Sequence, residues 1–132
     1  GRGAQQPETI YPHTDMTPEL LKLAEDLLPH TAPFPESVRS VVTDTVLSGG
    51  PATRVEVDVA FGDISDWWEK LPHTIPHTAE RNPVANLYLA LRYFMHAVQK
   101  VMWGVTPPPH DSTETARKRY NLYLEALNKE AL

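Results

Sequence analysis

The sequence predicts a mainly α-helical fold: four to five helices packed around a central helix at about 83–103, with one short strand or small β-hairpin at about 53–61. Several stretches repeat apolar residues at helical spacing, and proline-rich segments separate them. Only one stretch alternates apolar and charged residues as a strand does. We therefore expect a single helical domain at 17–132, preceded by an extended N-terminal arm at 1–16.

The composition is that of an ordinary globular protein. The chain has 132 residues, of which 41% are apolar and 22% charged, enough for one domain with a buried core. Without cysteine it has no disulfide, thiol nucleophile or zinc–thiolate site. The net charge of −5 argues against a general nucleic-acid binder, because such proteins carry a basic field, but it leaves room for a local basic patch.

The first predicted helix begins after Thr17. Thr17 is a good N-cap residue, Pro18 suits the first helical position, and Glu19 places a negative charge at the positive end of the helix dipole. Apolar residues follow at helical spacing until Pro29 ends the helix. Residues 1–16 show neither the helical nor the strand period, so we expect them to be extended.

The two stretches on either side of the Gly-Gly-Pro turn at 49–51 are harder to assign. From Glu36 onward, valines recur at helical spacing; a helix is favoured, although β-branched residues also suit a strand. Residues 53–61, TRVEVDVAF, alternate in the way that predicts a strand. Because one strand cannot satisfy its own backbone groups, its partner would be 38–47, the N-terminal arm or another subunit.

A short helix and a long helix are predicted next. The short helix, at 64–71, would have Asp63 as its cap. The long helix, at 83–103, has Asn82 as its N-cap and Gly104 just past its end. Its apolar residues lie on both sides, so it is either enclosed in its own domain or shared with a partner. Its polar and charged residues argue against a membrane span.

A basic run on the last predicted helix is the best candidate for a nucleic-acid contact. This helix is expected to start near Asp111 or Ser112, where a capping-box pattern occurs. It carries three consecutive cations followed by a tyrosine: Arg117, Lys118, Arg119 and Tyr120. Such cations bind phosphates, and such a ring stacks on bases. The same spacing also fits a solvated basic face whose tyrosine belongs to the core.

The histidines give only a weak indication of a metal site. His73 and His77 would share one face of a continuous helix, as zinc-binding i, i+4 pairs do. Pro72 and Pro76 break such a helix, and no second ligand motif completes the set, so loop histidines packed on prolines are favoured. With no nucleophile motif and no phosphate-binding loop, we expect no catalytic residues and no cofactor.

These observations favour a non-enzymatic structural or protein–protein interaction subunit of a larger assembly, for example a virion, a filament or a multi-protein complex. The subunit would assemble with copies of itself or bind another protein through five ring-bearing side chains, since large rings anchor protein interfaces: Trp67, Trp68, Tyr93, His96 and Trp103. The first alternative is a nucleic-acid-binding regulator or coat protein. The second is a metal-dependent or small-molecule enzyme around His73 and His77. We expect a soluble protein, in the cytoplasm or in a particle.

Overall fold

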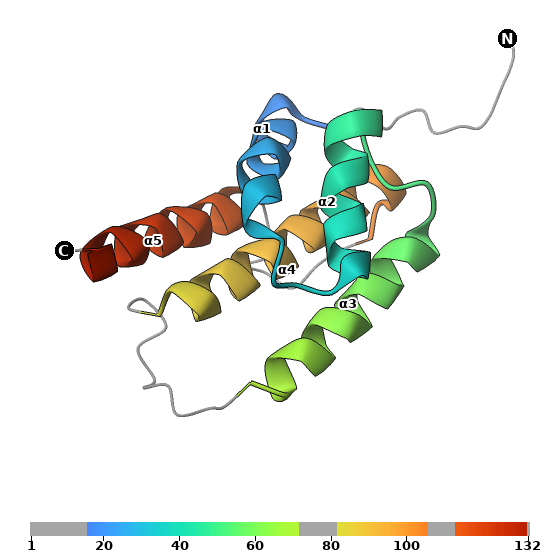
Figure 1. Ribbon diagram of the computed structural model, residues 1–132. Helices are drawn as coiled ribbons and strands as arrows, with labels where there is room; N and C mark the ends of the chain where they lie inside the picture. The colour runs from blue at the N-terminus through green and yellow to red at the C-terminus, as the bar shows by residue number, and fades with distance from the viewer. Residues whose placement is uncertain (1–15, 72–81, 106–112, 132) are drawn as a thin grey trace, which may run out of the picture.

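The computed structural model describes residues 16–71, 82–105 and 113–131, and the fold of these residues is helical (Figure 1). The elements are α1 (Pro18–Leu27), the 3₁₀ helix η1 (Leu28–His30), α2 (Glu36–Ser48), α3 (Arg54–Glu69), α4 (Pro83–Trp103) and α5 (Thr113–Ala131). The predicted mainly α-helical class is confirmed. Of the predicted arm at 1–16, only Met16 lies within the described residues, and its side chain is buried.

The first two helices have the ends that their local sequences predict. At α1, the Thr17 hydroxyl accepts a hydrogen bond from the backbone N–H of Leu20 at 3.1 Å, and Pro18 occupies the first helical position. At the end of α2, Gly49 adopts a left-handed conformation with φ of 80°, which a glycine accepts at no steric cost. The preference for a helix over a strand in α2 is therefore confirmed.

The predicted strand at 53–61 is wrong, because these residues form the cap and first half of α3. The Thr53 hydroxyl caps the helix by accepting a hydrogen bond from the backbone N–H of Glu56 at 3.2 Å. The buried residues of α3 recur at helical spacing and are Val57, Ala60 and Ile64. Of these, only Val57 belongs to the series of alternating apolar residues. No strand occurs in the described part of the chain, so it contains no β-hairpin either.

The predicted short helix at 64–71 is the second half of α3, which ends at Glu69. Asp63 is therefore an interior residue of the helix and not a cap. Its carboxylate accepts a hydrogen bond from the hydroxyl of Ser37 in α2 at 2.6 Å. This contact ties α2 to α3, and the two helices form a helical hairpin around the turn at 49–53.

The long helix α4 has its predicted bounds and supplies much of the core. Asn82 caps its start, and Gly104 follows its end with φ of 69°. α4 contacts α1, α3 and α5, and α5 runs antiparallel beside it (Figure 1). Its fully buried residues, such as Phe94, pack with leucines of α1 and valines of α2 in one cluster. None of the described helices has the length and apolar character to cross a bilayer.

Candidate functional site

The most exposed large apolar side chains of the described residues lie on the α2–α3 hairpin. Leu47, at the end of α2, is 77% exposed, and Val55 and Val59 in α3 are 66% and 49% exposed. Single exposed apolar residues are normal on protein surfaces. Here, however, the three most exposed ones belong to one supersecondary unit, and this clustering makes the hairpin the leading candidate for a contact surface.

Helix geometry places these side chains on the outward side of the hairpin. In α2, the buried residues Val42 and Thr45 lie on the side opposite Leu47. In α3, the buried Ala60 and Ile64 lie opposite Val55 in the same way. α2 and α3 contact each other through the flanks that lie between their buried sides and these outward sides. We call the outward side the hairpin surface, formed by four residues: Leu47, Val55, Val59 and Gly62.

Charged and polar residues surround the hairpin surface along α3. Asp58 is exposed, and its carboxylate accepts a hydrogen bond from the side-chain amide of Gln99 in α4 at 3.0 Å. On the α2 side, burial and then the nearby carboxylate of Asp44 raise the pKa of Glu56. The surface therefore has an apolar centre and a polar border, which is the usual arrangement of a protein interface.

Two of the five ring-bearing residues predicted for the interface, the tryptophans of α3, pack on rings elsewhere in the chain. Trp67 packs on Phe34, with ring centroids 4.3 Å apart, and is half-buried. The neighbouring Trp68 stacks on Tyr88 of α4 at 4.4 Å. The two adjacent tryptophans thus pack on different parts of the chain, as neighbouring helical residues must because they point in different directions.

The other three predicted interface residues belong to α4. The ring of His96 lies 4.4 Å from that of Phe61 in α3. Tyr93 and Trp103 are half-buried and pack against the core cluster. All five ring-bearing residues therefore keep only part of their surface exposed, and their role at an interface stays a prediction.

Two of the three cations in the basic run of α5 make contacts within the chain. The guanidinium of Arg117 pairs with the carboxylate of Asp26 in α1 at 2.8 Å. Arg119 donates to the side-chain oxygen of the buried Asn86 at 3.2 Å. Lys118 is exposed, whereas Tyr120 is only 7% exposed and belongs to the core. A nucleic acid would therefore meet one outward cation here, without a ring that is free to stack.

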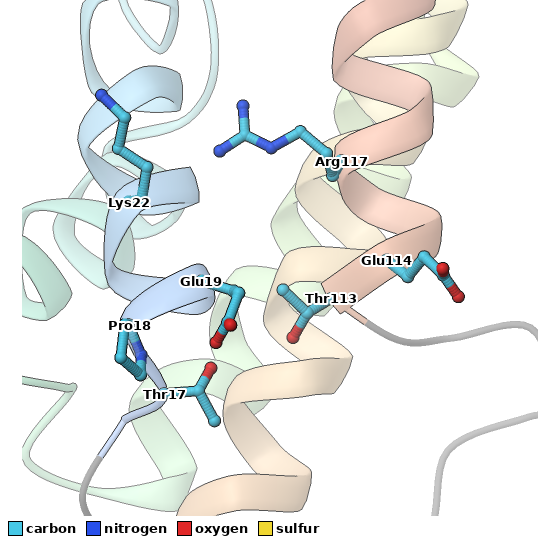
Figure 2. Close-up of a pocket in the computed structure, with 7 residues that line it drawn as sticks. All are labelled: Thr17, Pro18, Glu19, Lys22, Thr113, Glu114 and Arg117. Carbon is cyan, nitrogen blue, oxygen red and sulfur yellow. The ribbon is translucent and has the colours of Figure 1, made fainter.

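A cleft of about 730 Å³ lies between the starts of α1 and α5 (Figure 2). Seven residues line it: Thr17, Pro18, Glu19, Lys22, Thr113, Glu114 and Arg117. Burial raises the pKa of the adjacent Asp26 carboxyl, but hydrogen bonds and charges from Arg117 and Lys22 outweigh it and lower the pKa overall. Because two glutamates and two cations, Lys22 and Arg117, line the walls, the lining of the cleft carries no surplus charge of either sign.

The weak metal candidates His73 and His77 lie outside the described residues. Among the residues that the structure describes, no three histidine, cysteine, aspartate or glutamate side chains come together as metal ligands would. The histidine at the end of η1 has a different environment. Nδ1 of His30 lies 2.8 Å from the hydroxyl of Tyr123 in α5, so this ring joins η1 to α5.

Comparison of the chain with models of protein families, with curated proteins and with solved structures found no match. A function for this chain is therefore inferred from its own surface.

Proposed function

We propose that the chain is a non-enzymatic interaction subunit that binds a protein, either another copy or a different chain, within a larger assembly. The observation that carries this proposal is the exposure of Leu47, Val55 and Val59 on the hairpin surface. Burying apolar surface contributes roughly 25 cal/mol per Å², so covering these side chains favours association. The polar border would then set the orientation of the partner.

The nucleic-acid alternative has less support from the contacts within the chain. Arg117 and Arg119 would each have to leave a hydrogen-bonded partner before binding a phosphate, which reduces the gain from that contact. The enzyme alternative depends on His73 and His77, which lie outside the described residues. We therefore place both alternatives behind the interaction subunit.

Site-specific photo-crosslinking in the source cell tests the proposal. A photoreactive amino acid replaces Val55, and in a matched control it replaces the exposed Asn121 on α5. We expect a discrete protein adduct from position 55 that weakens when Val59→Asp is also present, and no such adduct from position 121. An absence of adducts at position 55, or the same adducts from both positions, would contradict the proposal.

A further inference from the structure

Three segments that are far apart in the sequence meet at the turn of the α2–α3 hairpin. They are Met16, just before α1, Gly50, just after α2, and Met102, near the end of α4. A Cβ at Gly50 would lie 2.7 Å from Sδ of Met102 and 3.1 Å from Cε of Met16. Both methionine side chains therefore pack directly on the backbone of the turn.

The turn contains the end of α2, and the methionine that packs on it belongs to the end of α4. At the end of α2, the backbone N–H groups of Gly49 and Gly50 donate to carbonyl oxygens in the last turns of the helix, at 3.1 and 3.2 Å. At the end of α4, the N–H groups of Gly104 and Val105 do the same, at 3.0 and 3.4 Å. Because helix ends open more easily than the core, a change at the sulfur of Met102 would act on both ends.

Met102 is the most exposed of the chain's three methionines. Met95 is fully buried and Met16 is 7% exposed, whereas Met102 is half-buried. A small oxidant therefore reaches Met102 first. Oxidation turns the apolar thioether into a polar sulfoxide, which disrupts apolar contacts. The side of the sulfur that faces Gly50 has no room for the added oxygen atom.

We propose that Met102 is a site of reversible oxidation and that its sulfoxide loosens the turn of the hairpin. The oxidised sulfur moves away from Gly50, and the ends of α2 and α4 lose their shared apolar contact. Met16 loses a neighbour in the same step. This inference does not depend on the proposed function.

The oxidant is hydrogen peroxide, which transfers one oxygen atom to Sδ of Met102. The S–O bond forms as the O–O bond breaks, and water leaves. The sulfur loses two electrons, and the peroxide gains them. A sulfoxide reductase reverses the change: two thiols are oxidised to a disulfide, and the oxygen atom leaves as water.

Limited treatment of the native chain with peroxide tests the site. We expect peptide mass spectrometry to detect the sulfoxide of Met102 at least about tenfold sooner than that of Met95, because the core encloses Met95. Met16 should also be oxidised more slowly than Met102. Equal rates at Met102 and Met95 would overturn the inference.

Urea denaturation and hydrogen exchange test the consequence of the oxidation. The oxidised chain should have a lower urea midpoint, and the N–H groups of Gly50 and Val105 should exchange faster. The N–H of Thr31, which donates to a carbonyl oxygen of η1 at 3.2 Å beyond the other end of α2, is the control and should not change. Sulfoxide reductase with dithiothreitol should restore the original values. A Met102 sulfoxide that leaves the midpoint and the exchange unchanged would contradict the proposal.

Leucine variants assign the effect to one sulfur atom. Met102→Leu keeps an apolar side chain of similar volume that peroxide does not oxidise, so its urea midpoint should not respond to peroxide. Met16→Leu is the matched control and should respond as the original chain does. Each variant is compared with its own untreated sample, so a change in starting stability does not affect the result. A Met102→Leu chain that still loses stability in peroxide would overturn the assignment to Met102.

Discussion

Helices α3 and α4 are both rich in apolar residues, yet they use them differently. α4 buries eleven of its 21 residues, whereas α3 buries three of its 16 and leaves two valines largely exposed. The reason is their surroundings: α4 contacts three other helices, while the outward side of α3 has none against it in the described structure. Whether a helix offers an apolar surface to a partner therefore depends on which elements pack against it, and its apolar content alone does not decide this.

The largest expected effect is at Phe94, a fully buried residue of α4. Phe94→Ala should lower the free energy of unfolding by about 3–5 kcal/mol, because it removes buried contacts and leaves a cavity. Val55→Ala in α3 should change it by less than about 0.5 kcal/mol, since that side chain is mostly exposed. Urea denaturation measures both. Similar losses in the two variants would remove the contrast between the helices.

A smaller effect is expected at Thr53, which caps α3. Thr53→Ala should cost about 1 kcal/mol, because the backbone N–H of Glu56 loses its acceptor. Thr53→Ser keeps a hydroxyl at the same place and should retain most of the stability. Equal losses in both variants would show that the methyl group of the threonine matters more than the cap.

The smallest effect concerns Glu56, whose raised pKa means that the folded state disfavours its charged form. A raised carboxyl pKa contributes stability at low pH, and this contribution is lost as the pH rises through the folded-state pKa. Glu56→Gln should therefore gain up to about 0.5 kcal/mol near pH 7, with no gain where Glu56 is protonated in both states. Urea denaturation at a series of pH values tests this, with the exposed Glu25→Gln as control. A gain that does not change with pH would contradict it.

The ends of α4 were predictable because capping is a local interaction. Asn82 reaches a backbone N–H three residues away, and Gly104 needs only its own conformational freedom. The same local signal was present at Thr53 and Glu56, which match a capping-box pattern, but the strand prediction did not use it. That pattern would have placed the start of α3 correctly.

The candidate site was less predictable than the helices. The sequence predicted an interface of large rings, but Trp67 and Trp68 each pack on a ring from outside α3. The hairpin surface was missed because Val55 and Val59 were assigned to the apolar side of a strand. Gly62 inside an apolar stretch was a signal that could have drawn attention to this region.

By itself, the sequence determined the helical class and the ends of α1, α2 and α4, because caps, prolines and glycines act within a few residues of one another. Only the tertiary structure decided whether residues 53–61 form a strand or a helix, because their alternating valines fit a strand whereas the buried residues fit a helix. It also decided which apolar residues stay exposed. That outcome depends on which helices pack together, and residues as far apart as Ser37 and Asp63 hold the hairpin in place.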